Sequence, residues 1–157
     1  LLPVGYLLVT QERAAYESGS MRLVIPRLEL DTQVLDDTEL ETLEKAPGLY
    51  KYGQIPNLYN ANVSIAAHRD LHRCEFYYLD MVGEGDSIYL VYRDTVFRYA
   101  YRSTNIQEAD DWNAIRCFHD SRVTLTTCDP VGTSLRRMVV VGELVSVEAY
   151  TEDYLFA

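Results

Sequence analysis

The apolar residues of this chain come in short runs, and this segmentation limits its fold more than any other feature. Runs rich in Val, Ile, Leu and Tyr lie at 63–67, 87–92, 123–127 and 138–141, and clusters containing Gly, Pro, Asp and Asn lie between them. Runs of this length suit strands better than helices, which need about ten residues or more. The sequence therefore predicts a mostly β protein with one or two short helices.

Length and charge narrow the range of partners. A chain of 157 residues is the right size for one compact domain. Its 24 acidic and 14 basic residues give a net charge of -10, which opposes nucleic acid or an anionic membrane surface as the main partner. Solubility is the simpler explanation of this charge.

The first 20 residues read differently from the rest. The opening LLPVGYLLV is apolar, but its nine residues are too few for a bilayer, which needs about 20. It is either a short element packed on the core or the remnant of a membrane anchor. Polar, helix-compatible residues follow, up to a break at Ser18-Gly19-Ser20. We expect an N-terminal segment at 1–20 and a folded domain at 21–157.

Local signals predict the individual elements. Two short edge strands are expected on either side of Pro26, and a short helix is expected after Asp37 or Thr38, either of which can cap it. The run at 63–67 is typical of a central buried strand, and a hairpin is expected with its tight turn at Asp94-Thr95. A polar loop or helix at 108–120 precedes two final strands.

Three cysteines raise the question of thiol reactivity. Cys74, Cys117 and Cys128 cannot all pair within one chain, so at least one is free or bonds another chain. No two of them form a C-x-x-C pair, and the histidines are scattered at 68, 72 and 119. We therefore expect no metal site and no cofactor.

Three residue types that suit acyl transfer stand at the ends of predicted central strands: His68, Cys128 and Arg137. A thiol with a pKa of about 8.5 needs a neighbouring cation or base to react at neutral pH. Histidine can return a proton to a leaving amine, whereas arginine stays charged and stabilises an anion.

Taken singly, each residue has a plainer explanation. A cysteine at a strand end is commonly a small buried apolar residue. A His-Arg-Asp triplet is commonly a solvated turn, and an arginine that begins a strand commonly discourages edge-to-edge aggregation.

The surrounding sequence resembles the sortase family from Met21 to Val147. Sortases carry a Thr-Leu-x-Thr-Cys strand, a loop and then an Arg that leads an apolar strand; here these are TLTTC at 124–128 and RRMVVVGEL at 136–144. SIAAHRD resembles the family's Gly-His-Arg motif, with Ala67 in place of the glycine. LVIPRLELDTQV and FYYLDMVGEGDSIYL resemble two further family segments.

The resemblance implies a closed or nearly closed eight-stranded β-barrel and a set of catalytic residues. It makes Cys128 the nucleophile, His68 the general acid and base, and Arg137 the stabiliser of the reacting group. Arg136 competes with Arg137, but Arg137 directly precedes MVVV, as the family arginine does. Because side chains alternate along a strand, only one of the two can face Cys128.

The same resemblance suggests which residues bind substrate. Alternation places Thr126 on the face of Cys128, where it would line a peptide groove, whereas Thr127 would act through its backbone. Ala67 stands beside the histidine, and its methyl group restricts the backbone there more than glycine would.

The implied reaction is cleavage of an LPxTG-like sorting signal in a secreted protein through a thioacyl-enzyme. An amine on the cell wall or on a pilin then takes over the acyl group, with water as the slow default acceptor. Such an enzyme works at the extracellular face of the cell membrane, held by an N-terminal anchor. In that oxidising setting Cys74 and Cys117 either form a disulfide or remain two buried thiols.

Two rival functions stay open. One is a sortase that assembles pili or mainly hydrolyses its substrate, although residues 1–20 lack the Asp-Pro-aromatic motif of lidded pilin polymerases. The other is a non-catalytic β-barrel binding module in which Ala67 marks lost activity. Glu108, Asp110 and Asp111 are candidates for a calcium site, but they equally suit a solvated acidic loop.

Overall fold

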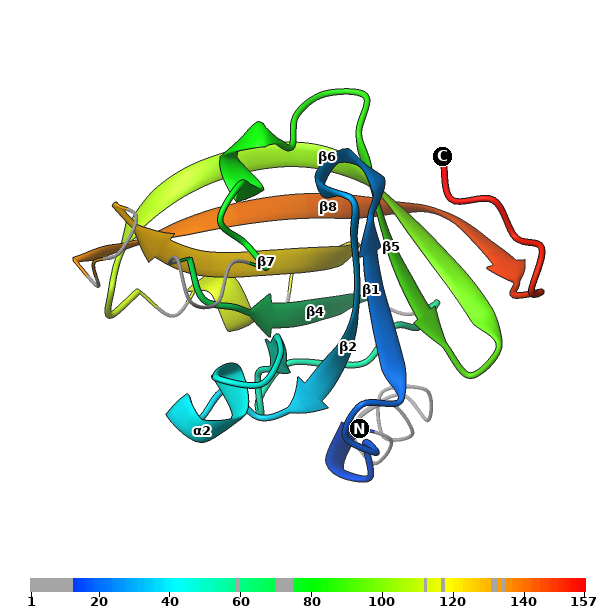
Figure 1. Cartoon of the computed structure of the whole chain (residues 1–157), viewed down its shortest axis with the longest axis horizontal. Coiled ribbons are helices and arrows are strands. Elements are labelled where there is room, and N and C mark those ends of the chain that lie inside the picture. Colours follow the sequence, from blue (N-terminus) through cyan, green and yellow to red (C-terminus); the bar gives the residue numbers. More distant parts are fainter. Residues whose placement is uncertain are drawn as a thin grey trace.

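The chain folds into a closed β-barrel, shown in Figure 1. The computed structural model describes residues 13–58, 60–69, 75–111, 113–116, 118–130, 133 and 135–157. Their eight strands are β1 (Met21–Ile25), β2 (Leu30–Asp36), β3 (Gly48–Leu49), β4 (Ala61–Ala66), β5 (Ser87–Tyr92), β6 (Thr95–Glu108), β7 (Ser121–Asp129) and β8 (Arg136–Ala149). The mostly β, eight-stranded architecture expected from the sequence is confirmed.

The barrel closes in the order β1-β2-β3-β4-β7-β8-β6-β5. Two neighbouring pairs, β2 with β3 and β4 with β7, are parallel, and the remaining neighbours are antiparallel. Closure corrects one expectation: the strands beside Pro26 are not edges, because β1 pairs with both β2 and β5. Pro26 instead begins a 3-10 turn, η1 (Pro26–Leu28), where its missing N–H costs no ladder hydrogen bond.

The β5–β6 hairpin turns one residue earlier than expected. Arg93 and Asp94 both have positive φ, 51° and 57°, and Thr95 already belongs to β6. Two consecutive left-handed residues match the right-handed twist of the flanking strands. The sequence showed that a polar turn joins the two strands, but it did not show at which residue the turn begins.

One short helix, α2 (Leu40–Leu43), lies between β2 and β3. The Asp37 carboxylate accepts hydrogen bonds from the Thr42 hydroxyl at 2.7 Å and from the Glu39 N–H at 3.0 Å. These bonds lower the pKa of Asp37. The expected cap at Asp37 or Thr38 is corrected, because the N-cap residue is Glu39 and its side chain makes no capping hydrogen bond. Position 48 requires glycine, because a Cβ there would lie 2.1 Å from the Asp37 carbonyl oxygen.

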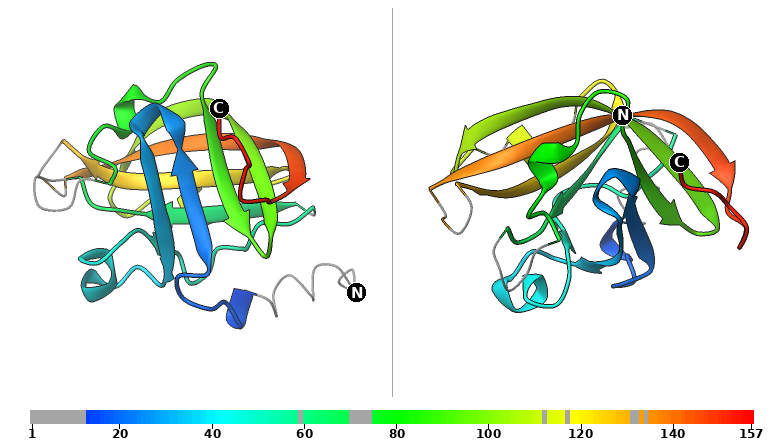
Figure 2. Two further views of the ribbon diagram at one scale, coloured as in Figure 1. Left: turned by 45° about the vertical axis from the view of Figure 1, so that its right-hand side comes forward. Right: turned by 45° about the horizontal axis from the view of Figure 1, so that its top comes forward.

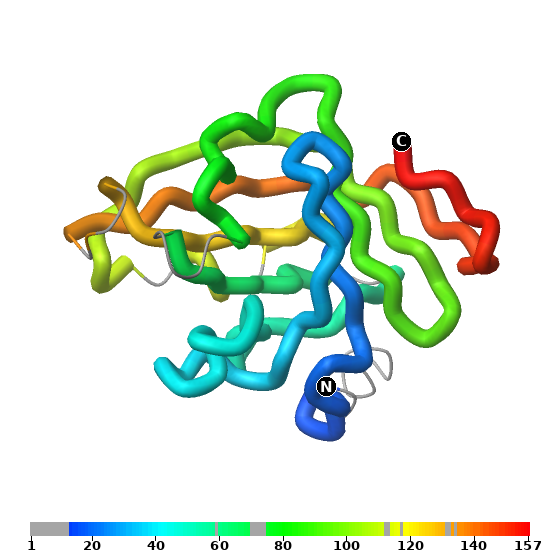
Figure 3. The backbone as a smooth tube through the Cα atoms, viewed as in Figure 1, coloured from blue at the N-terminus to red at the C-terminus, as the bar shows by residue number. Residues whose placement is uncertain are grey.

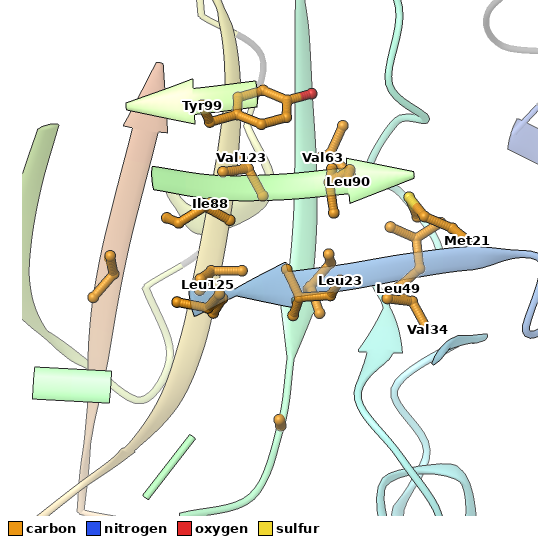
Figure 4. Close-up of a cluster of buried hydrophobic side chains, with 14 of the residues drawn as sticks. Met21, Leu23, Val34, Leu49, Val63, Ile88, Leu90, Tyr99, Val123 and Leu125 are labelled. Atoms are coloured by element: carbon orange, nitrogen blue, oxygen red, sulfur yellow. The ribbon is translucent and has the colours of Figure 1, made fainter. Parts of the chain in front are cut away.

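Alternation along the strands separates the barrel interior from its outer surface. Val123 and Leu125 of β7 point inward with Met21, Leu23 and Tyr99 into the core drawn in Figure 4. The intervening residues of β7 therefore point outward. Thr124, Thr126 and Cys128 are among these outward residues.

The last residues cover a different part of the barrel. Tyr150, Tyr154 and Phe156 pack on a second cluster formed by Val24, Tyr89, Val91 and Val96. Figure 2 and Figure 3 show the chain turning back after β8 and running beside β5. The Arg22 guanidinium lies over the rings of Tyr150 and Phe156, which fastens the tail to β1.

Residues 13–20 pack against the barrel. The Tyr16 hydroxyl donates to the Val34 carbonyl at 2.6 Å, and Arg13 forms an ion pair with Asp36 at 2.8 Å. Within the described part of the chain, no helix is both long and apolar enough to span a membrane. The apolar opening at 1–9 lies outside the described residues, and the boundary at residue 20 stays a prediction.

Candidate active site

Cys128 lies near the end of β7, half-buried and as a free thiol. In the antiparallel register with β8 it stands directly opposite Arg137, and Asp129 stands opposite Arg136. Directly opposed residues project to the same face of a sheet, so Arg137 shares the outer face with Cys128.

His68 lies on the other side of β7 from Arg137, at the position along the strands that Cys128 occupies. The parallel strands β4 and β7 pair Ala66 with Thr126, and His68 and Cys128 each come two residues later. The contact continues past the strand end: the Ala67 N–H donates to the Thr126 carbonyl at 3.2 Å. His68 therefore lies at the level of Cys128, across β7 from Arg137.

The residue before the histidine does not need to be glycine. Ala67 is 4% exposed and is not among the residues with positive φ. Its carbonyl accepts a 2.7 Å hydrogen bond from the Thr127 hydroxyl. The Thr127 side chain therefore ties the end of β4 to β7, and the Ala67 methyl group fits without backbone strain.

Arg69 binds the backbone behind the thiol. Its side chain is 7% exposed, and it donates to the Cys128 carbonyl at 3.3 Å and to the Tyr77 carbonyl at 3.2 Å. Ion pairs join it to Asp80 at 3.2 Å and Asp129 at 3.5 Å. One guanidinium thus links the His68 loop, the end of β7 and the segment before β5.

The two neighbouring arginines of β8 have different partners. The exposed Arg136 forms an ion pair with Asp129 at 3.6 Å, on the opposite face from Cys128. Arg137 lines a cavity of about 190 Å3 together with Thr126, Tyr50 and Ile115. The register therefore assigns Arg137, and not Arg136, to the surface that carries the thiol.

Tyr50 belongs to this cavity although the sequence did not single it out. Burial raises the pKa of its phenol, while the charge of Arg137 opposes the rise. The Thr126 hydroxyl lies beside the phenol and also opposes the rise. It is buried, yet it makes no well-aligned hydrogen bond with any described residue. A buried hydroxyl in this state is available to a ligand.

Comparison with known proteins decides the family. The model of the sortase domain matches residues 23–145, which is most of the chain.

The chain belongs to the sortase family.

Curated and solved relatives agree with this assignment. Sortase D of Bacillus subtilis is 29% identical over 128 residues, covering 79% of this chain and 63% of the relative. Sortase SrtE2 of Streptomyces coelicolor is 36% identical over 104 residues, covering 59% of this chain and 40% of the relative. The chain thus spans less than two thirds of either relative.

A solved sortase shows the same fold. The crystal structure of Streptococcus pneumoniae sortase C superposes with a TM-score of 0.76 at 26% identity, covering 83% of this chain and 70% of that one. The resemblance read from TLTTC, SIAAHRD and the flanking segments is confirmed at the level of family and fold.

The sortase cavity has a roof that is held by polar groups of β4. The 3-10 helix η3 (Asn113–Ile115) lies over the outer face of β4 and β7. The Asn62 amide donates to the Ala114 and Arg116 carbonyls, each at 2.9 Å, and the Ser64 hydroxyl donates to the Ala114 carbonyl at 2.8 Å. Thr124 completes the network by donating to the Asn62 side chain at 2.6 Å.

Another cavity, of about 370 Å3, lies far from the thiol. Arg22, Tyr92 and Tyr150 contribute to its wall, and its described lining contains neither cysteine nor histidine. Among the described residues, no group of three or more His, Cys, Asp or Glu side chains is placed to hold a metal ion.

Sequence reasoning brought together the three catalytic candidates but missed Tyr50 and Arg69. Tyr50 follows β3 with no motif of its own, and the pairing of β3 with β4 and of β4 with β7 brings it to Thr126. Arg69 had a visible signal, because a charge next to a catalytic histidine is a candidate for positioning it. Cys74 and Cys117, expected as a disulfide or as two thiols, lie outside the described residues.

Proposed function

We propose that this sortase domain is a cysteine transpeptidase that cleaves an LPxTG-like sorting signal and transfers the acyl part to an amine. The observation that carries the proposal is the register around Cys128: Arg137 stands directly opposite it in β8, and His68 follows the paired end of β4 on the other side of β7. Family membership supports the same reaction class.

Cys128 acts as the nucleophile. Its thiolate attacks the carbonyl carbon at the cleavage site and forms a carbon–sulfur bond, while the carbonyl oxygen becomes an oxyanion. Arg137, which is charged at pH 7, stands directly opposite the thiol. The half-buried position of the thiol lets a peptide reach it while limiting access of water.

Arg137 stabilises the oxyanion. Its guanidinium stays charged, and the residue stands directly opposite Cys128 in the β7–β8 register, where it can reach developing negative charge. A backbone N–H next to Cys128 is the second donor. When the intermediate collapses, the carbon–nitrogen bond breaks and His68 gives its proton to the departing amine. A thioester on Cys128 remains.

An incoming amine completes the reaction. It attacks the thioester carbonyl, His68 takes its proton, and the carbon–sulfur bond breaks to return the Cys128 thiolate. Atoms and charge balance without a cofactor. Water replaces the amine slowly, which makes hydrolysis the side reaction.

The peptide lies in the cavity beside the thiol. Thr126 offers its buried hydroxyl to the acyl part of the substrate. The Thr127 hydroxyl is already bound to Ala67, so Thr127 contributes through its backbone. Ala67 holds the chain next to His68 and shapes the edge of the groove.

Location follows from the proposed substrates. Sorting signals belong to secreted proteins, and the acceptor amine belongs to the cell wall or to a pilin. The domain at 21–157 would then act at the extracellular face of the cell membrane, with residues 1–20 carrying the end of an anchor. The anchor is tested by detergent extraction of the full-length protein from membranes, and a protein released by salt alone would contradict it.

Mass spectrometry of peptide products tests the reaction. The protein is incubated with a panel of LPxTG-like peptides, with and without triglycine, and compared with the Cys128→Ala and Arg136→Gln variants. We expect a ligated product that requires triglycine, is lost in Cys128→Ala and persists in Arg136→Gln. No product and no acyl-enzyme across the panel would contradict the proposal.

The same experiment separates the rivals. The solved Streptococcus pneumoniae sortase C is described in terms of pilin substrate specificity. If triglycine leaves the product unchanged and only cleaved peptide accumulates, the mainly hydrolytic alternative replaces transpeptidation. A pilus-assembling enzyme would instead prefer a pilin lysine over triglycine. A Cys128 thiol that resists alkylation at neutral pH would favour the binding module.

A further inference from the structure

A second cavity continues from the one beside the thiol. It has a volume of about 290 Å3 and shares Gln107, Ala114 and Val139 with the first cavity. Both lie on the outer face of β7 and β8 and run toward the beginning of β7. Together they form one extended groove, in which the cavity farther from Cys128 is called the distal pocket.

The distal pocket is positively charged. Arg116 and Arg122 line it, and no carboxylate is among its described lining residues. Ser103, Asn105 and Thr124 add polar side chains. This charge contrasts with the net charge of -10 for the whole chain. Such a local reversal of sign favours an anionic ligand group at this point of the surface.

The arginines are held in place by an aromatic ring and a carboxylate. The Arg122 and Arg116 guanidinium groups lie 3.8 and 5.0 Å from the centre of the Phe118 ring. Asp120 receives two hydrogen bonds from Arg122, each 2.8 Å, and one of 2.6 Å from Arg102. Because Asp120 is shared by Arg122 and Arg102, these three side chains together carry one positive charge in excess. Glu143 stands opposite Arg122 in the β7–β8 register, outside the pocket lining.

The direction of a bound peptide follows from the proton donor. His68 comes after the end of β4, so it lies at the Cys128 end of the groove, away from the distal pocket. The leaving amine must reach His68, which places the downstream part of the substrate at that end. The upstream part, which stays on Cys128 as the acyl group, then runs toward the distal pocket.

The length of the groove sets the spacing. The distal pocket includes Thr124 and Arg122, which are four and six strand residues from Cys128. At about 3.3 Å per residue these steps correspond to roughly 13 and 20 Å. An extended peptide whose carbonyl is attacked at Cys128 therefore brings its fourth to sixth upstream neighbours to the distal pocket.

We propose that the distal pocket selects sorting signals with an Asp or Glu four to six residues upstream of the cleaved residue, through Arg116 and Arg122. This inference rests on the proposed function, because it assigns the acyl donor to the groove. In an LPxTG-like signal these positions are the three that immediately precede the leucine.

Two measurements test the inference with one peptide series. The parent is Ser-Ser-Ser-Leu-Pro-Gln-Thr-Gly-Ser, and each of its three leading serines is replaced in turn by Glu, Gln or Lys. Ligation to triglycine gives kcat/KM. Fluorescence anisotropy of the labelled peptides on the Cys128→Ala variant gives affinity without turnover.

We expect Glu at one or two positions to raise kcat/KM and affinity about fivefold over Gln, and Lys to lower both. The effect is expected in KM with kcat unchanged, because the pocket is remote from the reacting atoms. Molar salt should remove the preference. Arg116→Gln and Arg122→Gln should each reduce it to less than about twofold. The control Arg27→Gln removes a charge that pairs with Asp86 and lines neither cavity, and it should retain the preference.

The outcomes separate this inference from the proposed function. Equal turnover of the Glu and Gln peptides, or a preference that both arginine variants retain, would overturn the distal pocket but leave transpeptidation intact. A charge preference in binding without any turnover would keep the pocket and contradict the reaction. Neither turnover nor millimolar binding by any peptide would contradict both. If Arg122→Gln fails to fold for lack of its Asp120 pairs, Arg116→Gln decides.

Discussion

The outside of the barrel is covered in two places, and the two covers are built from opposite chemistry. Over β4, β7 and β8, the segment around η3 is held by hydrogen bonds from Asn62 and Ser64. Over β1, β5 and β6, the C-terminal tail is held by stacked and edge-on aromatic rings, among them Phe156 against Tyr89 with ring centres 5.0 Å apart.

The difference between the polar cover and the aromatic cover indicates that the first serves function and the second serves stability. A polar cover leaves donors and acceptors beside the groove, including the Thr126 hydroxyl that no described residue satisfies. An aromatic cover removes apolar surface from water and gains from the favourable edge-on geometry of the rings. We therefore expect substitutions under the first cover to change catalysis and those under the second to change the free energy of unfolding.

The largest expected effect comes from Arg137→Gln. Loss of a preorganised cation beside an oxyanion should lower kcat by about 100-fold to 1,000-fold. The thermal midpoint should change little, because Arg137 is at the sheet surface. Steady-state ligation kinetics measure this loss. Arg136→Gln, which removes the neighbouring charge on the opposite face, should stay within about twofold of wild type. Equal losses in both variants would show that the two faces are not distinguished.

Arg69→Met tests whether Arg69 supports both the stability of the fold and the reactivity of Cys128. Its side chain is buried and joins two carbonyls to two carboxylates, so we expect about 2–3 kcal/mol of lost unfolding free energy. Ligation should also slow, because the Cys128 carbonyl loses its donor. Urea unfolding and kinetics measure both. Arg27→Met, on a half-exposed side chain, is the control. If Arg69→Met loses no more unfolding free energy than Arg27→Met, the proposed role of Arg69 is contradicted.

Phe156→Ala tests the aromatic cover. The ring contacts Tyr89 and Tyr154 and lies under the Arg22 guanidinium, so its removal should cost about 1–2 kcal/mol of unfolding free energy. The value of kcat/KM should not change. Leu155→Ala is the matched control, since Leu155 is 86% exposed. If Phe156→Ala slowed ligation and left the unfolding free energy unchanged, the aromatic cover would serve catalysis and not stability, contrary to this prediction.

The smallest effect concerns acid. Hydrogen bonds from Arg122, and then from Arg102, lower the pKa of Asp120 in the folded protein. A carboxylate whose folded pKa is depressed adds stability above its unfolded pKa, and this stability is lost as the pH falls through the folded value. Asp120→Asn should therefore lower stability by less than about 1 kcal/mol at neutral pH and narrow the gap to wild type below about pH 4. Thermal unfolding from pH 7 to pH 3 measures the gap, and a constant gap would contradict the linkage.

Much of the fold was readable because strands leave local signals. The buried run at 63–67 and the run at 87–92 correspond to β4 and β5, and TLTTC with RRMVVV identified the strands that carry the thiol and its arginine. The resemblance to the family, whose arginine directly precedes the apolar strand, favoured Arg137 over Arg136, and alternation allowed only one of them to face Cys128. These predictions rest on period and order, which a single sequence contains.

What the sequence could not give depends on contacts between distant segments. Barrel closure pairs β1 with β5 and turns two expected edge strands into interior members of the sheet. Tyr50 reaches Thr126 through the pairing of β3 with β4 and of β4 with β7, and the distal pocket needs β6, β7 and η3 together. Such placements follow from long-range pairing, for which residues near in sequence carry no signal.

Intact-mass spectrometry of the acyl-enzyme tests the central claim most directly. The protein is mixed with a cleavable LPxTG-like peptide without any added amine and quenched in acid. We predict a mass increase equal to the upstream peptide fragment, located on Cys128 by peptide mapping and released by hydroxylamine. No adduct on a protein that still cleaves the peptide, or an adduct on a different residue, would contradict the account.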